Sequence, residues 1–147
     1  MNAQIFSFCA MQPQDYDSLI ELWQAAGLPY RPQGRDSREK LLTELQNPQE
    51  RFILAYAENR LAGTILVSHD GRKGWLNRLA VHPDFRHQGL AARLIEQAEQ
   101  FLAQAGITVY ACLIEDWNEP SMQLFSRQGY TRHDDIIYFV KKQSAES

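Results

Sequence analysis

The chain has 147 residues, of which 44% are hydrophobic and 22% are charged, and its net charge is −3. These values are typical of a soluble globular protein, and we predict one domain spanning residues 1–147. The charge gives no general attraction to nucleic acid or to anionic membranes. No apolar run is long enough to span a bilayer, and no signal peptide is recognised. Cys9 and Cys112 show no metal-binding or disulfide spacing, so we predict a cytoplasmic enzyme or binding domain.

The first half of the chain predicts four strands and two helices. Asp36, with Glu39 three residues later, is a capping-box pattern and places the start of the second helix at Asp36. The loop between the two helices is rich in proline and glycine. The predicted elements are strand 5–11, a helix between Asp15 and Gly27, loop 28–34, a helix from Asp36 to residue 47, and strands 52–57, 61–67 and 75–81.

The stretch 75–105 organises the rest of the predicted fold. An apolar run ending at Val81 predicts the end of a buried strand, and Pro83 breaks it because proline cannot donate to a sheet ladder. Apolar residues then recur at helical spacing from Ala91 onward. The first N–H groups of a helix attract phosphate, and Gly89 leaves room for a close approach. The sequence therefore predicts an anion site here, although a helix that simply begins at a glycine is the alternative.

The remaining elements follow in short order. Residues 107–114 predict a buried strand, and Asn118 is a candidate N-cap for a short helix that ends at Gly129. Two closing strands are expected at residues 130–133 and 136–140. The order of elements, β-α-α-β-β-β-α-β-α-β-β, predicts an α/β fold with a mixed sheet and helices on both faces.

Two motifs carry a family resemblance. The sequence R-x-x-G-x-A follows L-A-V-H-P, and N-E-P-S-M-Q-L-F-S-R-Q-G-Y follows downstream. Together they resemble the signatures of the GNAT superfamily of acetyl-CoA-dependent N-acetyltransferases, and the resemblance covers about residues 52–140. It implies a central, mostly antiparallel mixed sheet that is splayed at a cofactor cleft. It also implies acetyl-CoA as co-substrate, bound through Leu79, Ala80, Val81, Arg86, His87, Gln88, Gly89, Leu90, Ala91, Asn118 and Phe125.

The catalytic groups depart from the family pattern. The amine needs a base, the oxyanion needs a donor, and the leaving thiolate needs a proton. The family's tyrosine acid is replaced by Phe125, so Tyr110 and Tyr130 are the substitutes, each with a structural role as the alternative. Leu113 occupies the slot of a glutamate base found in one branch of the family. We therefore name Glu115 as the candidate base, and a solvated loop carboxylate is the alternative.

The implied reaction is direct acetyl transfer in a ternary complex to a primary amine of an unidentified small molecule, peptide or protein. We interpret Cys112 as a packed core residue rather than a nucleophile, and we expect no metal. Tyr30, Arg31 and Arg35, on the loop at residues 28–35, suit a polar or negatively charged acceptor. A non-catalytic acyl-CoA-binding or sensing module is the main alternative, and a nucleotide-binding domain is a remoter one. A homodimer and a monomer both stay open, with no nucleic-acid or membrane partner expected.

Overall fold

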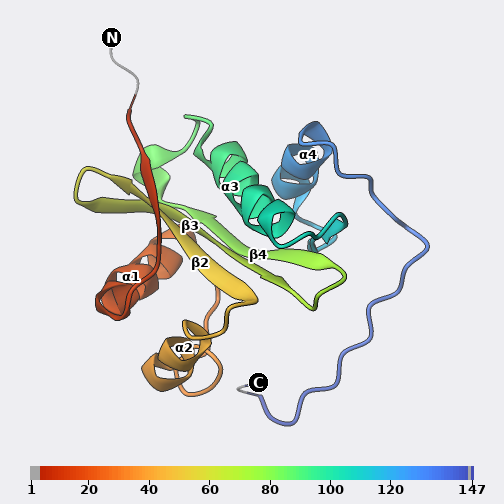
Figure 1. The fold of residues 1–147 in the computed structure, drawn as a ribbon, viewed down its shortest axis with the longest axis horizontal. Helices are drawn as coiled ribbons and strands as arrows, with labels where there is room; N and C mark the ends of the chain where they lie inside the picture. Colours follow the sequence, from red (N-terminus) through yellow and green to blue (C-terminus); the bar gives the residue numbers. More distant parts are fainter. Residues whose placement is uncertain (1–3, 146) are drawn as a thin grey trace.

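The computed structural model describes residues 4–145 and residue 147. Its centre is one five-stranded sheet in the order β1-β2-β3-β4-β5 (Figure 1). The first four strands pair antiparallel with their neighbours, and β5 runs parallel to β4. The predicted mixed, mostly antiparallel sheet is therefore confirmed. The strands are β1 (Ser7–Ala10), β2 (Glu50–Ala57), β3 (Arg60–His69), β4 (Gly74–Val81) and β5 (Tyr110–Ala111).

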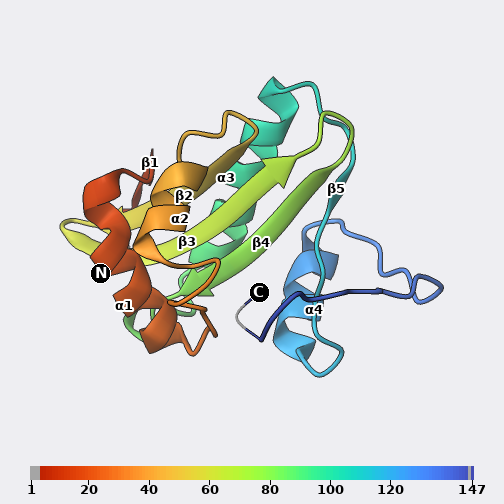
Figure 2. The same cartoon turned by 90° about the horizontal axis from the view of Figure 1, so that it is seen from below.

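Helices cover both faces of the sheet, as predicted. α1 and α2 lie on one face, and α3 and α4 lie on the other (Figures 1 and 2). One-turn 3-10 helices precede α1 and α3. The helical elements are Pro13–Asp15, α1 (Tyr16–Ala26), α2 (Arg38–Glu44), Pro83–Phe85, α3 (Leu90–Gln104) and α4 (Glu119–Arg127).

The sheet separates two apolar cores because alternate strand residues point to opposite faces. The core under α3 and α4 includes Ile65, Leu94 and Leu102, each fully buried. The core under α1 and α2 includes Trp23 and Leu41, also fully buried. The long helix α3 is thereby fixed against the sheet, which positions the loop at its amino end.

The predicted start of α2 at Asp36 is wrong by one residue. Ser37 is the N-cap, and its side chain accepts from the N–H of Lys40. Asp36 is buried instead, where its carboxylate accepts from the N–H of Arg31 at 2.7 Å and pairs with Arg78 at 3.3 Å. Asp36 therefore forms a tertiary ion pair with Arg78 instead of capping α2, as its local sequence pattern predicted.

The carboxyl-terminal strands differ most from the prediction. Only Tyr110–Ala111 of the predicted strand 107–114 pairs with the sheet. The predicted closing strands at residues 130–133 and 136–140 are wrong, since neither has ladder pairing within the described residues. A strand needs a partner for its backbone groups, and after α4 the chain runs around the outside of the molecule instead of returning to the sheet (Figure 1).

Candidate functional site

A β-bulge in β4 shapes the central cleft. Asn77 stands opposite Leu66 and Ala80 opposite Thr64, so two residues of β4, Arg78 and Leu79, share a single position on β3. Arg78 has a φ of 56°, which is uncommon for a residue other than glycine. An extra residue of this kind bends a strand and increases its twist. The bend lies just beyond the point where β4 loses its pairing with β5.

The two strands β4 and β5 separate beyond their first residues. Gly74 pairs with Tyr110 and Trp75 pairs with Ala111, and no further pairing joins these strands in the described chain. The edge of β4 from residue 76 to Val81 is therefore open on the β5 side. Figure 2 shows the two strands diverging toward the amino end of α3 and toward α4.

The pairing of β4 with β3 indicates which backbone groups face this gap. Antiparallel pairs alternate between hydrogen-bonded and non-bonded. The N–H of His82 donates to Ala62 at 2.8 Å, so the adjoining Val81 directs its own N–H and C=O toward the gap. By the same alternation Leu79 faces the gap, whereas Ala80 faces β3. Of the three β4 residues predicted to pair with the ligand, only Leu79 and Val81 therefore present backbone groups to it.

The Arg86 side chain contacts the end of the open edge. Its Nε donates to the Val81 carbonyl at 3.2 Å, which occupies one of the two lone pairs of this oxygen and leaves the Val81 N–H as a donor for a ligand. Arg93 does not approach the same place, because its guanidinium stacks over the Phe8 ring at 4.8 Å.

The loop before α3 forms a concave row of backbone donors. His87 and Gly89 both have positive φ, 64° and 76°, and Gly89 is the N-cap of α3 without a side-chain cap. No group among the described residues accepts from the N–H groups of residues 87–92. A Cβ built on Gly89 meets nothing within 4 Å, so the loop opens into space. Unpaired donors at the positive end of a helix dipole suit a phosphate.

The predicted residues of this loop divide into two groups. The side chains of Arg86, His87 and Gln88 are exposed, whereas Leu90 is buried and anchors α3 to the core. Ala91 is half-buried. Leu90 and Ala91 can therefore contribute their backbone N–H groups, while positive charge comes from Arg86 and from His87 when it is protonated.

Asn118 caps α4, as the sequence indicated. Its Oδ1 accepts from the N–H of Ser121 at 3.3 Å, and its own N–H donates to the Glu115 carbonyl at 2.9 Å. No acceptor for its side-chain Nδ2 is found in the described chain. The cap therefore fixes the side chain and leaves the two N–H donors of Nδ2 for a ligand.

Phe125 is a core residue at the edge of the cleft. It is 6% exposed, and its ring meets the Tyr130 ring edge-on at 5.1 Å between centroids. The Tyr130 hydroxyl donates to Glu99 at 2.8 Å. Burial, together with this carboxylate, raises the pKa of Tyr130, which makes it a poor proton donor at neutral pH. The structure therefore favours the structural role for Tyr130.

Glu115 and Cys112 lie near the diverging end of β5. Glu115 is exposed, and no hydrogen bond of its carboxylate is found in the described residues. Cys112 is half-buried, and burial raises the pKa of its thiol to about 11. A thiol that stays protonated at neutral pH is a weak nucleophile, in keeping with a packing role.

The Arg78 side chain extends from the bulge to the face of the sheet that α1 and α2 cover. It donates to the Pro29 carbonyl at 2.7 Å, and its guanidinium lies 4.1 Å from the centre of the Trp23 ring. With the Asp36 pair, these contacts tie the loop between α1 and α2 to the bulged strand. Sequence reasoning missed this cluster because no local pattern reports a partner 42 residues away.

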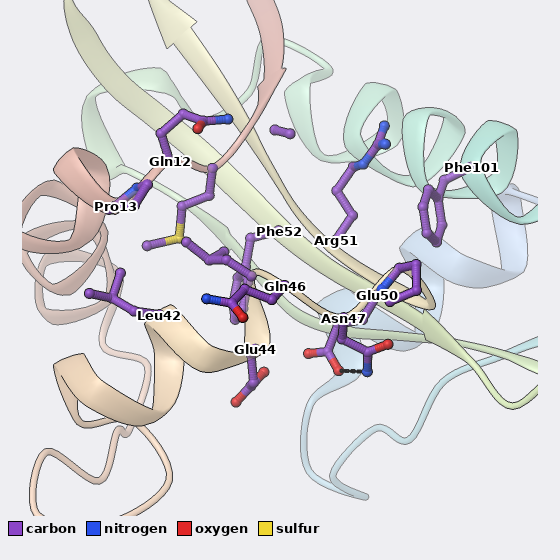
Figure 3. Close-up of a pocket in the computed structure, with 14 residues that line it drawn as sticks. Gln12, Pro13, Leu42, Glu44, Gln46, Asn47, Glu50, Arg51, Phe52 and Phe101 are labelled. Carbon is purple, nitrogen blue, oxygen red and sulfur yellow. Dashed lines mark hydrogen bonds between the residues drawn. The ribbon is translucent and has the colours of Figure 1, made fainter.

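A separate cavity of about 410 Å³ lies between α2 and the start of β2 (Figure 3). None of the predicted cofactor residues lines it. Asn47 donates to Glu50 at 3.1 Å on its wall. Burial and the neighbouring Glu50 carboxyl raise the pKa of Glu44 to about 8, and no sequence signal pointed to this pair. No residue of β4 lines this cavity, so we assign the chemistry to the cleft.

Among the described residues, no group of three or more His, Cys, Asp or Glu side chains could hold a metal ion. Among the same residues, no helix has the length and apolar character needed to cross a bilayer.

Comparison with known proteins gives consistent matches. The sequence profile of the Acetyltransferase (GNAT) family matches residues 16–130. An acetyltransferase of Yersinia enterocolitica is 28% identical over 126 residues, which cover 86% of this chain and 88% of that protein. A PaiA N-acetyltransferase from Thermoplasma acidophilum, solved with coenzyme A, has a TM-score of 0.78 at 22% identity and covers 88% of this chain and 92% of its own.

A second solved structure is similar over nearly the whole chain. It is an aminoglycoside acetyltransferase from an uncultured soil metagenomic sample, in complex with sisomicin. Its TM-score is 0.77 at 16% identity, with 95% of this chain and 97% of that chain covered. At such identities the two solved structures show a shared fold.

Proposed function

This chain belongs to the acetyltransferase (GNAT) family, and on that premise we propose that it transfers an acetyl group from acetyl-CoA to a primary amine. In this proposal both substrates are bound together and the amine attacks the thioester directly. The acceptor is a small molecule, a peptide or a protein. The observation that carries the proposal is the open edge of β4, which leads directly to the unpaired N–H groups at the start of α3.

The residues present fit acetyl-CoA, which supplies the activated acetyl thioester when it is bound. The N–H groups of residues 87–92 would bind the pyrophosphate, because they are unpaired and lie at the positive end of the α3 dipole. The amide-containing pantetheine arm would lie along β4 and bond to Leu79 and to the N–H of Val81. Asn118 would donate from Nδ2 to the same arm. Phe125 would contribute an apolar wall.

The chemical step needs a base, an oxyanion donor and a proton for the leaving thiolate, and the chain offers candidates for the first two. An alkylamine is mostly protonated at neutral pH, and we propose that Glu115 accepts its proton directly or through water. The N–H of Leu79 points into the gap beside the bulge and would stabilise the developing oxyanion. Phe125 has no proton to give, so the leaving thiolate would take its proton from water or from the ammonium that the attack creates.

The acceptor would enter beside the loop between α1 and α2. Arg78 anchors this loop to the bulged strand β4 through Pro29 and Asp36, and these contacts support an acceptor site near the loop. Arg35 is exposed and Arg31 is half-buried, so the loop presents positive charge. This supports an acceptor that carries a polar or negatively charged group in addition to its amine.

Two measurements test the proposal. Acetyl-CoA at 100 times its dissociation constant should stabilise the fold by about 2.7 kcal/mol. For a chain of this size that raises the melting temperature by roughly 5–10 °C. A panel of amines should then release free thiol from acetyl-CoA. Thermal stabilisation without thiol release from any amine would favour the alternative, a module that binds acyl-CoA without turning it over.

A further inference from the structure

Arg78 has a backbone conformation that residues other than glycine rarely adopt. Its φ of 56° lies in the left-handed region, where the Cβ of an ordinary residue crowds the following carbonyl oxygen. The residue stands at the β-bulge, where it shares one position on β3 with Leu79. A strained residue of this kind persists only where the surrounding structure holds it. The contacts of Arg78 therefore show what keeps the bulge in this conformation.

Three contacts hold the far end of the Arg78 side chain. Its guanidinium donates to the Pro29 carbonyl at 2.7 Å and to the Asp36 carboxylate at 3.3 Å. The same group lies 4.1 Å from the centre of the fully buried Trp23 ring. The exposed fraction is 17% for the Arg78 side chain and 9% for that of Asp36. A planar guanidinium that is bonded on two sides and stacked on a ring has little freedom to move.

Asp36 is itself fixed within the loop between α1 and α2. Its carboxylate accepts from the N–H of Arg31 at 2.7 Å, and its own N–H donates to the Arg31 carbonyl at 3.0 Å. Its carbonyl accepts from the hydroxyl of Tyr16, a residue of α1, at 2.7 Å. Arg78 is therefore paired with a residue that three further hydrogen bonds hold in place.

The backbone of Arg78 determines where the N–H of Leu79 points. The peptide bond that joins the two residues is planar, so its orientation depends on the dihedral angles of Arg78. The alternation of pairing with β3 directs this N–H into the gap between β4 and β5. If Arg78 moved to a commoner backbone conformation, the N–H of Leu79 would turn away from the gap.

We propose that Arg78 is a positioning residue that holds the Leu79 N–H against the thioester carbonyl of acetyl-CoA. The three contacts of its side chain keep the strained backbone in place, and the strained backbone aims the donor. This inference rests on the proposed function, because it requires acetyl-CoA in the gap. The guanidinium is occupied by its own contacts, so Arg78 acts through the Leu79 peptide and not on the substrate.

The affinities for two coenzyme A derivatives test this role without a known acceptor. Acetyl-CoA carries the thioester carbonyl, whereas S-ethyl-CoA has a methylene group in its place. The ratio of their dissociation constants, measured by isothermal titration, therefore reports the hydrogen bond to the carbonyl. A bond of this kind corresponds to roughly a 2- to 13-fold difference in affinity. We define the preference for acetyl-CoA as this ratio.

Two substitutions of Arg78 should have opposite outcomes. Arg78→Ala removes the contacts and keeps a Cβ, so the backbone should relax and the preference for acetyl-CoA should fall by roughly 2- to 13-fold. Arg78→Gly removes the same contacts, but glycine adopts this φ without strain, so it should restore most of the preference. Both variants should bind S-ethyl-CoA as the parent does. A residue needed only for stability would not separate the two derivatives.

A milder variant and a control complete the experiment. Asp36→Asn keeps the shape of the side chain and removes its charge, so it should lower the preference in the same direction as Arg78→Ala. Added to Arg78→Gly, it should have no further effect. Arg51→Ala is the matched control, because Arg51 is an arginine of β2 that lies over the Phe101 ring at 4.9 Å, and it should keep the parent's preference.

The outcomes separate this inference from the proposed function. A parent that binds neither derivative overturns the proposed function and this inference with it. A parent that binds both, with an unchanged preference in Arg78→Ala and Asp36→Asn, overturns the positioning role alone. An equal loss of preference in Arg78→Ala and Arg78→Gly overturns it as well, because the effect then does not pass through the backbone conformation.

Discussion

The phosphate-binding loop yields a prediction with an internal control at the other end of the same helix. Gly89 and Gly106 have nearly the same backbone conformation, with φ values of 76° and 80°. A Cβ at either position meets nothing within 4 Å. The two glycines flank the 15 residues of α3, so they are 17 positions and about 25 Å apart along the helix axis. Gly89→Ala and Gly106→Ala therefore impose the same strain, and only the first adds a methyl group at the proposed pyrophosphate site.

The expected magnitudes separate folding from binding. A residue with a Cβ costs about 1–2 kcal/mol in this left-handed conformation, so both variants should lose a similar amount of stability. Hydrogen bonds to a charged group contribute about 1.5–3 kcal/mol each. If the methyl group displaces one such bond between phosphate and the loop, coenzyme A should bind about 10- to 150-fold more weakly to Gly89→Ala. Gly106→Ala should keep the affinity of the parent within about twofold.

Isothermal titration with coenzyme A, together with thermal melts of the free proteins, measures both quantities. Equal melting temperatures with a selective loss of affinity in Gly89→Ala would support the loop as the phosphate site. If the two variants bind coenzyme A equally well, the unpaired N–H groups of this loop do not hold the pyrophosphate, and the reasoning from the helix terminus fails.

Three further predictions concern single side chains. Phe125→Tyr should preserve or raise turnover, because the added hydroxyl would supply a proton to the thiolate; a large loss of rate with unchanged coenzyme A affinity would show that this buried position has another role. Glu115→Gln should lower kcat by about 10²–10⁴-fold and leave the affinity for coenzyme A unchanged. A pH–rate profile identical to that of the parent would show that Glu115 is a solvated loop residue and not the base. Glu44→Gln should flatten the pH dependence of stability. The pKa of Glu44 is raised to about 8, so the folded state holds a proton that the unfolded state releases near pH 4.5. Stability should therefore fall in the parent, and not in the variant, as the pH rises from about 4.5 to about 8. Thermal melts between pH 5 and 9 should show this difference, and parallel curves would contradict it.

The sequence predicted the regular elements where periodicity is strong and the ends are marked. α3 has buried residues at helical spacing between two glycines, and it lies close to the predicted range. Strands β2, β3 and β4 were placed within about two residues of their observed bounds. The resemblance to the family is confirmed by the match over residues 16–130. In each case the signal is local, or is carried by a motif of fixed spacing.

The features that sequence reasoning missed depend on distant partners. Asp36 looked like a helix cap, and only the folded chain brings it to Arg78. The closing strands were predicted from composition, yet a ladder requires a neighbouring strand, and β5 offers residues 136–140 no pairing within the described chain. The roles assigned to Glu115, Asn118 and the loop before α3 stay predictions, because they concern a ligand.

The bulge in β4 makes the number of residues in this strand as consequential as their identity. Leu76, Leu79 and Val81 all pack toward α3, although a regular strand would place Leu76 on the face opposite the other two. The bulge sets Arg78 and Leu79 at one position, and this brings the three side chains to a common face. Deleting Arg78 would therefore remove the bulge and leave the later side chains on the same faces, while the strand would lose its bend and the contacts of Arg78 with Pro29 and Asp36. One residue inserted between Leu79 and Val81 would instead turn Val81 over and direct its backbone groups toward β3.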